Sequence, residues 1–402
     1  MRVVYIHQYY CNPQMAGGIR SYEQAKRLVA RGHTVDVITT DITPGERELG
    51  WKVTHEDGVT VHWFKIPYNN HMSFARRLRA FAEFMLLATV RAARLKADLV
   101  FATSTPLTVA VPGVLAARLR RVPFVFEVRD LWPEVPIEMG ALRNPLARRL
   151  AGGLADFAYR NAAEVVALSP GMAAGVTRRR PGTAVTVVPN AADLDLFHVD
   201  PAQVKRFRGE HRWLGDRPLL VYTGALGAVN GVEYLVRAMD RIRDTDPGIQ
   251  LLIVGHGREW ESTERLAADL GLLDRTVRMW AKVPKSELPV ILGAATMSTS
   301  TVRPIRGLWD NSANKFFDAL AAERPIAINY GGWQADLLTD TGAGLVLDPH
   351  DADAAGDVLA IHLRDEDWLV KARSAAHRLA VEQFSRDMLF ERFEAVLTRS
   401  AA

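Results

Sequence analysis

Short apolar runs rich in Val, Ile and Phe alternate with longer amphipathic segments along nearly the whole chain of 402 residues. Near-continuous apolar strands that are separated by helical segments are typical of a parallel sheet covered on both faces. The first series of predicted strands is Val3–Ile6, Val35–Thr39, Val59–Phe64, Leu99–Ala102, Phe124–Val128, Val165–Ala167 and Val185–Val188. The pattern therefore predicts an α/β fold with a doubly wound sheet.

The pattern starts again after a polar stretch that carries no strand signal. The second series of predicted strands is Leu219–Thr223, Leu251–Val254, Thr276–Met279, Ala295–Thr299, Ile326–Ile328 and Gly344–Leu347. We therefore expect a Rossmann-like domain at 1–198, a linker at 199–217, a second Rossmann-like domain at 218–380, and a C-terminal helix at 381–402 that could pack back on the first domain. Two such domains would leave a cleft between them, and ligands of open α/β sheets bind at the carboxyl ends of the strands.

The composition limits the kinds of structure, the cellular compartment and the classes of ligand that suit this chain. Hydrophobic residues make up 48% and charged residues 24%, which excludes disorder, collagen-like repeats or a coiled coil for the whole chain. The single cysteine, Cys11, allows neither an internal disulfide nor a cysteine-based zinc site, and this fits a reducing cytoplasm. A net charge of +4 favours an anionic small ligand or an acidic membrane surface over nucleic acid.

Targeting and membrane-spanning signals are not found in the sequence. Met1–Ile6 has the pattern of a strand and not of a signal peptide. The sequence contains no run of about 20 apolar residues, which is the length that a helix needs to span a bilayer. We expect a cytoplasmic protein that is soluble or peripheral at the inner membrane face.

In each half, a glycine-containing loop follows the first predicted strand. In the first half, Gly17 and Gly18 precede a helix. In the second half, Gly224 lies near the start of the segment Thr223–Gly231. Such loops let backbone amides and a helix N-terminus approach an anion. Gly255–Arg258 repeats the arrangement one unit later and adds a cation, Arg258. The alternatives are a flexible connection for the first loop and an ordinary strand-to-helix turn for the second.

Charged residues follow the predicted strand that ends at Val128. Glu127, Arg129, Asp130 and Glu134 would lie at the carboxyl edge of the sheet, and Pro133 and Pro136 argue against a helix that solvates them. Charges in this position commonly face a ligand. The alternative is an internal pair between an arginine and a carboxylate.

The strongest candidate segment is Arg303–Asp318, where cations surround the predicted start of a helix. Asn311 or Ser312 could cap that helix and leave free N–H groups at its positive end. The field there would attract a diphosphate, and the carboxylates could hold hydroxyl groups. The cations are Arg303, Arg306 and Lys315, and the carboxylates are Asp310 and Asp318. The alternative is a capped helix with solvated charges.

Motifs for metal or nucleophilic chemistry are missing. Three Asp-x-Asp pairs, which start at Asp193, Asp244 and Asp351, are interpreted as turn or cap residues and not as metal ligands. Neither His-Glu-x-x-His nor Gly-x-Ser-x-Gly occurs in the sequence. We therefore expect no metal and no cofactor.

These elements together resemble the retaining glycosyltransferases of family 4, which have the GT-B fold of two facing Rossmann-like domains. The resemblance extends over nearly the whole chain and rests on Gly17-Gly18, Arg31–Val35, Val188–Asp193, Tyr222–Gly224 and Asn314–Pro325. A finer match, to the branch that makes bacterial surface polysaccharides and often transfers amino-sugars, rests on Thr103–Leu107 and Glu127–Glu134.

Three positions depart from the pattern of that family. The pair usually formed by two glutamates is Asp310 and Asp318 here, and each side chain is one methylene shorter. The Arg and Lys usual in the first loop of the second domain match Ala225 and Asn230. The usual His of the first domain matches Arg129. Another cation must therefore meet the charge of the diphosphate.

The resemblance implies transfer of a hexose or N-acetylhexosamine from a nucleotide diphosphate, with UDP favoured, to a hydroxyl acceptor, with retention and without metal. The implied catalytic residues are Arg129, Asp130 and Asp310. The implied donor-binding residues are Gly17, Gly18, Gly224, Arg258, Arg303, Arg306, Asn311, Ser312, Asn314, Lys315 and Asp318. Two alternatives stay open, a sugar-nucleotide epimerase and a non-catalytic subunit that binds sugar nucleotides.

The acceptor is expected on the first domain. The segment Phe74–Lys96 combines six basic residues with apolar ones and suits an interfacial helix beside an anionic membrane that carries a lipid-linked acceptor. An ordinary helix packed on the sheet is the alternative, and a soluble acceptor stays open.

Overall fold

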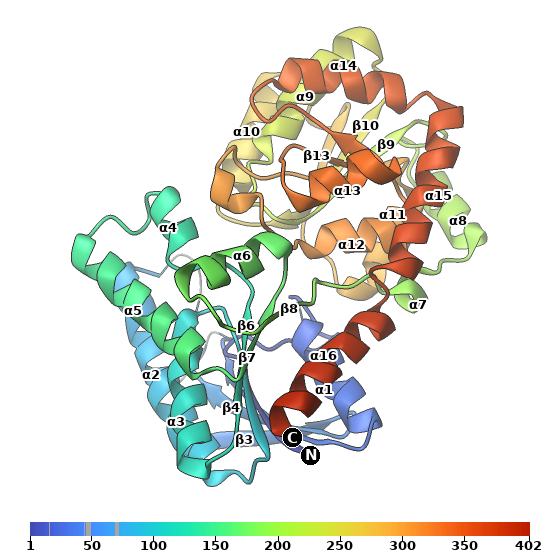
Figure 1. The fold of residues 1–402 in the computed structure, drawn as a ribbon. Coiled ribbons are helices and arrows are strands. Elements are labelled where there is room, and N and C mark those ends of the chain that lie inside the picture. Colours follow the sequence, from blue (N-terminus) through green and yellow to red (C-terminus); the bar gives the residue numbers. More distant parts are fainter. Residues whose placement is uncertain (16, 44, 46–49, 69–71) are drawn as a thin grey trace. The chain divides into compact units, whose positions relative to one another are not determined.

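The computed structural model describes residues 1–15, 17–43, 45, 50–68 and 72–402, so Ala16 of the first glycine loop lies outside the described residues. The chain divides into two compact units. Unit 1 comprises Met1–Asn12, Gly17–Pro189 and Leu389–Ala402, and unit 2 comprises Pro13–Ala16 and Asn190–Met388. Figure 1 shows the elements of both units.

Unit 1 is built on an eight-stranded sheet with the strand order β3-β4-β2-β1-β5-β6-β7-β8. Its strands are β1 (Arg2–Ile6), β2 (Thr34–Asp41), β3 (Trp51–Glu56), β4 (Val59–Lys65), β5 (Leu99–Thr103), β6 (Phe124–Val128), β7 (Glu164–Ala167) and β8 (Val185–Val187). All neighbours pair in parallel except β3, which is antiparallel to β4. The sequence did not predict β3, because its alternating polar residues at the sheet edge give no buried apolar run.

Helices cover both faces of this sheet (Figure 1). They are α1 (Arg20–Ala30), α2 (Phe74–Arg94), α3 (Ala110–Arg120), α4 (Glu134–Glu138), α5 (Pro145–Asn161), α6 (Pro170–Arg179) and the greater part of α16 (Arg386–Ala401). On one face, α2, α3 and α5 bury their apolar sides against Val4, Val100 and Phe126. On the other face, Phe393 of α16 packs edge-on against Phe101, with ring centroids 5.1 Å apart.

Unit 2 has a six-stranded, wholly parallel sheet in the order β11-β10-β9-β12-β13-β14. Its strands are β9 (Leu219–Ala225), β10 (Gln250–His256), β11 (Val277–Trp280), β12 (Met297–Ser300), β13 (Ile326–Ile328) and β14 (Gly344–Val346). This is the strand order of dinucleotide-binding folds, in which the connection reverses between the first and fourth strands. The reversal lies here between β9 and β12.

The helices of unit 2 are α7 (Leu194–Phe197), α8 (Pro201–Glu210), α9 (Glu233–Thr245), α10 (Trp260–Asp269), α11 (Leu288–Ala294), α12 (Asn314–Ala321), α13 (Trp333–Thr341), α14 (Ala352–His362) and α15 (Glu366–Glu382). The stretch 199–217 differs from the expected linker, because it contains α8 and belongs to unit 2. Arg208 of α8 donates hydrogen bonds to the carbonyl oxygens of Gly215 and Ala294, which hold this polar helix in place.

Apart from the short segment 13–16, the chain passes between the units after Pro189 and after Met388. Close to both, Ala192 N–H donates to the Phe384 carbonyl oxygen at 2.8 Å, and Arg386 N–H donates to the Ala192 carbonyl oxygen at 3.1 Å. The end of α16 then joins unit 1, where Arg399 Nε donates to Glu164 at 2.7 Å. No helix in the described part of the chain is long and apolar enough to cross a membrane.

Candidate active site

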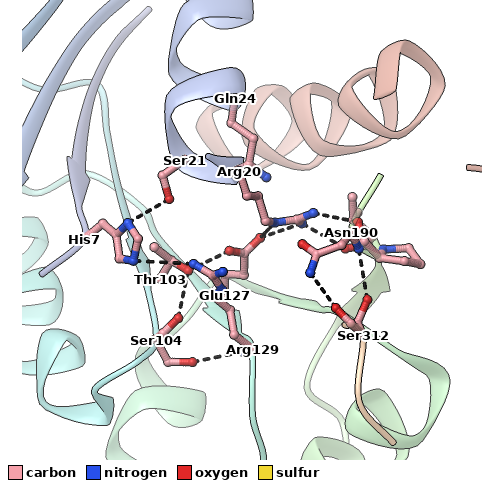
Figure 2. A network of polar contacts seen from close by, with 12 residues as sticks. His7, Arg20, Ser21, Gln24, Thr103, Ser104, Glu127, Arg129, Asn190 and Ser312 are labelled. Carbon is pink, nitrogen blue, oxygen red and sulfur yellow. Dashed lines mark hydrogen bonds and ion pairs between the residues drawn. The ribbon is translucent and has the colours of Figure 1, made fainter. Parts of the chain in front are cut away.

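In unit 1, three polar residues follow neighbouring strands at the carboxyl edge of the sheet. His7 follows β1, Ser104 follows β5 and Arg129 follows β6, and Figure 2 shows their side chains close together. Arg129 N–H donates to Ser104 Oγ at 2.9 Å, and Arg129 Nη1 lies 3.4 Å from His7 Nε2. His7 Nδ1 lies 2.9 Å from Ser21 Oγ. Of this group only Arg129 was predicted from the sequence as a site residue; His7 and Ser104 were not.

The imidazole of His7 is neutral at physiological pH. Desolvation by burial, and after it the charge of Arg129, hold the pKa of His7 well below 6.5. Because a guanidinium can only donate, Nε2 of His7 accepts, and the ring proton sits on Nδ1 and is donated to Ser21. His7 therefore serves as a fixed acceptor that helps to hold Arg129.

Glu127 does not face a ligand. Its carboxylate is fully buried and pairs with Arg20, which comes from α1, at 2.8 Å. Thr103 Oγ1 donates to the same carboxylate at 2.6 Å, and Arg20 also donates to the carbonyl oxygens of Val188 and Pro189. For Glu127 the alternative interpretation, an internal arginine–carboxylate pair, is the one that the structure shows.

The segment after Asp130 is helical, contrary to the argument from its prolines. Helix α4 begins at Glu134, with Pro133 at its N-cap and Pro136 in its first turn. The first N–H groups of a helix have no partner within the helix, so prolines at these positions cost nothing. Glu134 pairs with Arg179 at 3.0 Å, whereas Asp130 is exposed.

The first glycine loop passes close to Cys11. A methyl group added at Gly17 would lie 2.6 Å from Cys11 Sγ, so the Cys11 side chain would have to shift to admit it. Gly17 is exposed and Gly18 half-buried, just before α1 begins at Arg20.

In unit 2, the glycine loop after β9 meets the start of α12. Gly224 has a φ of +139°, and a methyl group on it would lie 3.2 Å from Cε and 3.3 Å from Nζ of Lys315. Lys315 Nζ donates to Tyr222 Oη at 2.8 Å and lies 4.1 Å from the ring centroid of Tyr222. Desolvation by burial lowers the pKa of Lys315 to about 7.

The start of α12 differs from the predicted cap. The helix begins at Asn314 after Ala313, and no side chain caps it. Asn311 Oδ1 accepts from Ala313 N–H, and Ser312 Oγ accepts from Asn190 N–H, so both oxygens are used outside the helix. The Ser312 contact is visible in Figure 2. The first amides of α12, those of Asn314 and Lys315, are therefore left for another acceptor.

The remaining cations and carboxylates of the candidate site differ in whether they already contact another side chain. Arg303 pairs with Glu259 at 2.6 Å, and the Arg306 guanidinium stacks 4.7 Å from the Trp309 ring centroid. Arg258 is exposed and forms no ion pair with any described residue. Asp310 is half-buried in the turn that precedes α12.

Asp318, one turn into α12, is buried and holds an ion pair that the sequence did not predict. Lys285 Nζ lies 2.5 Å from its Oδ2 atom, and the same ammonium lies 5.0 Å from the ring centroid of Phe197. The carboxylate of Asp318 therefore has a lysine partner within unit 2.

Two of the Asp-x-Asp pairs have the turn or cap role that was predicted: Asp351 caps α14, and Asp246 accepts from Gly248 N–H in the turn after α9. Asp193 lies at the start of α7, but its side chain makes no cap hydrogen bond and pairs with Arg386 instead. No cluster of three His, Cys, Asp or Glu side chains suited to a metal ion occurs within the described residues.

Two family models match the chain in the same order as its two units. The glycosyl transferase 4-like domain matches residues 17–191, and the glycosyl transferases group 1 model matches residues 217–365. A GDP-mannose-dependent alpha-(1-6)-phosphatidylinositol monomannoside mannosyltransferase of Mycobacterium tuberculosis is 28% identical over 311 residues, which cover 71% of this chain and 80% of that protein. A putative colanic acid biosynthesis glycosyl transferase of Escherichia coli, WcaI, is 25% identical over 297 residues, which cover 70% and 72%.

Solved structures share the fold over the full length. Sucrose-phosphate synthase of Thermosynechococcus elongatus superimposes with a TM-score of 0.78 and 18% identity, covering 99% of this chain and 98% of that one. HepE of Anabaena, in complex with UDP and glucose, has a TM-score of 0.74 and 17% identity, covering 99% and 100%. These likenesses confirm the predicted fold class. The chain belongs to the GT-B glycosyltransferases of the family 4-like group, which use nucleotide-sugar donors.

Proposed function

We propose that the protein transfers a hexose or N-acetylhexosamine from a uridine or guanosine diphosphate donor to a hydroxyl group, with retention of configuration and without a metal. Relatives named as GDP-mannose-dependent mannosyltransferases support a guanosine donor. The fold neighbours solved with UDP support a uridine donor, although their identity of 16–17% is lower. The base is therefore the first property to measure.

The observation that carries this proposal is the start of α12 beside the Gly224 loop. Free amides at a helix N-terminus, a backbone without side chain at Gly224 and the ammonium of Lys315 converge in unit 2. Such a set of donors suits a phosphate group. The residues proposed to bind the donor there are Gly224, Arg258, Arg303, Arg306, Asn311, Ser312, Asn314, Lys315 and Asp318.

The proposed reaction needs no nucleophile from the protein. The bond between the anomeric carbon and the diphosphate oxygen breaks, and the acceptor oxygen forms its bond to the same face of that carbon. The proton of the acceptor passes to the departing phosphate oxygen. Cations and amides stabilise the charge that develops on the diphosphate, which is the main contribution expected from the protein.

The other proposed catalytic residues act on hydroxyl groups. Arg129, which His7 and Ser104 hold in place, orients sugar or phosphate oxygens. Asp130 is exposed and accepts from an acceptor or sugar hydroxyl, and Asp310 accepts from the transferred sugar. The glycine loop at Gly17 and Gly18 lets the backbone of unit 1 approach a ligand.

For the acceptor we propose a lipid-linked hydroxyl compound at a membrane surface. Helix α2 buries Phe84 and Ala88 against the sheet, as an ordinary covering helix does, yet it also exposes Leu78, Leu86 and Val90. Arginines on the same helix would attract anionic lipid headgroups; they are Arg76, Arg77, Arg79 and Arg94, whereas Arg91 lies over the Trp51 ring and donates to His62. Relatives that are named as phosphatidylinositol mannoside mannosyltransferases support the proposal.

Calorimetric titration with UDP, GDP, ADP and dTDP, with and without EDTA, tests the donor proposal. We expect one nucleotide to bind, with an affinity that EDTA does not change. Incubation with the matching nucleotide sugar and NMR analysis of the anomeric proton then tests transfer and retention. Binding of none of the four would refute the donor site, and binding without hydrolysis or transfer would indicate a non-catalytic subunit.

Vesicle co-sedimentation tests the acceptor proposal. We expect binding to vesicles with anionic lipids and not to neutral ones, and a lower bound fraction for Leu86→Gln. The matched control is Val370→Gln, which changes an exposed apolar residue on α15. No sedimentation with either lipid mixture would favour a soluble acceptor instead.

A further inference from the structure

The loop after β9 lacks the cations that family members usually have there, and the structure shows which side chain can replace them. Ala225 and Asn230 occupy the two positions, and Asn230 Oδ1 accepts from Gly227 N–H at 3.3 Å. The loop therefore offers backbone groups and neutral side chains only. A donor with two negative phosphates needs a cation from another element of unit 2.

Among the candidate cations, Lys315 differs from the arginines. Arg303 is already paired with Glu259, and Arg306 lies on Trp309. Arg258 is exposed to solvent, which weakens any contribution by screening. Lys315 is 9% exposed and its ammonium points at the glycine loop, 3.3 Å from where a methyl group of Gly224 would lie.

No described carboxylate pairs with Lys315. The acids on the elements around it have partners of their own, since Glu259 pairs with Arg303, and Asp318, three residues further along α12, pairs with Lys285. The side chain that directly contacts the ammonium is Tyr222 on β9, through its hydroxyl and the face of its ring. A buried cation without a counter-ion raises the free energy of the folded protein. An anionic ligand that acts as the counter-ion removes this penalty, which favours its binding.

Tyr222 determines where the ammonium lies. Its side chain is fully buried, and its hydroxyl donates to the Ala225 carbonyl oxygen at 2.7 Å. Because the proton of this hydroxyl is engaged by the loop, only its lone pairs face Lys315 Nζ, which can donate to them. The same contact thus links the loop conformation to the position of the lysine.

We propose that Lys315 is the side chain that takes the charge of the donor diphosphate in place of the missing loop cations, and that Tyr222 is the residue that positions it. The assignment rests on the proposed function, because it names a group within the donor site. Burial lowers the pKa of Lys315 to about 7, so most of the free protein carries a neutral amine near pH 8. A phosphate at the ammonium favours the charged form, and nucleotide binding near pH 8 then takes up a proton.

Four proteins are compared by calorimetry with UDP, GDP, UMP and GMP, namely the wild type, Lys315→Met, Tyr222→Phe and the control Lys371→Met. Lys371 is exposed on α15. We expect Lys315→Met to weaken the binding of the nucleoside diphosphate at least tenfold and the binding of the monophosphate much less. Tyr222→Phe should bind the diphosphate severalfold more weakly than the wild type, and Lys371→Met should bind it as tightly as the wild type. Titrations at pH 8 in Tris and in HEPES give the number of protons taken up, which should be most of one for the wild type and none for Lys315→Met.

Thermal unfolding confirms that each variant is folded. Lys315 does not carry the diphosphate charge if Lys315→Met binds the diphosphate as tightly as the wild type. The same holds if the variant loses as much affinity for the monophosphate as for the diphosphate. If Tyr222→Phe keeps the wild-type affinity and pH dependence, Tyr222 does not position Lys315. Failure of the wild type to bind any of these nucleotides would instead overturn the proposed function itself.

Discussion

Substitution of Glu127 by alanine should strongly destabilise unit 1. The side chains of Glu127 and Arg20 are 0% and 6% exposed, so the pair is screened little by water. Removing one partner of a buried ion pair costs about 3–5 kcal/mol, because the other charge stays buried without compensation. Arg20 would keep its hydrogen bonds to the Val188 and Pro189 carbonyl oxygens, so we expect the lower end, about 3 kcal/mol.

Native-state hydrogen exchange measured by mass spectrometry suits this prediction, because it follows each unit separately. A loss of about 3 kcal/mol corresponds to exchange roughly a hundredfold faster for the slowest amides of β6. Amides of β9 in unit 2 should exchange as in the wild type. The double variant Arg20→Met with Glu127→Met removes both charges and should be less destabilised than Glu127→Ala alone. A double variant that is destabilised as much as Glu127→Ala, or more, would refute the reasoning.

The same pair should make unit 1 sensitive to acid. Desolvation alone would raise the pKa of the Glu127 carboxyl, but the charge and hydrogen bonds of Arg20 outweigh it and hold the pKa below 4.5. A folded-state pKa below the unfolded one gives stability that is present above pH 4.5 and is lost as the pH falls further. Between pH 5 and pH 3, the wild type should lose more stability than Glu127→Gln in the exchange experiment.

Two further substitutions test the packing of unit 2 around the donor site, both read out by urea unfolding and exchange. Gly255→Ala would place a methyl group 1.8 Å from the Gly224 carbonyl oxygen and should cost about 3 kcal/mol, whereas Gly153→Ala on α5 has no atom within 4 Å and should gain about 0.5–1 kcal/mol. Lys285→Met leaves the buried Asp318 carboxylate without its cation and should cost about 2–3 kcal/mol, of which a second change, Asp318→Asn, should recover most. A neutral effect of Gly255→Ala, or of Lys285→Met alone, would contradict these contacts.

The two-part α/β fold was predictable because its signal is local. Strands such as β1 and β9 are continuous apolar runs, and a glycine-containing loop follows each of these two. Strand β3 and helix α8 were missed, since their polar residues pack against only one neighbour and leave no apolar run. The prolines at 133 and 136 were misread because a proline is harmless in a first helical turn.

For the candidate site, the sequence indicates the segments that carry charged residues but not how their side chains pair. Which charges face a ligand depends on contacts between residues far apart in the sequence, and a single sequence does not show these contacts. Arg20 lies 107 residues from Glu127, and Lys315 lies 93 residues from Tyr222. His7 gave no motif signal, because its role arises only when β1 and β6 lie at the same sheet edge.

The return of the chain to unit 1 has a consequence for the order of folding during synthesis. Phe393 is fully buried in unit 1 and packs against Phe101 of β5, yet almost 300 residues separate the two in the sequence. Unit 2, apart from four early residues, is a continuous stretch and can close as soon as it has left the ribosome. Unit 1 is translated first but keeps an uncovered apolar face until residues 389–402 have emerged. The half made first is therefore the half completed last, and its apolar face is the one that stays uncovered longest.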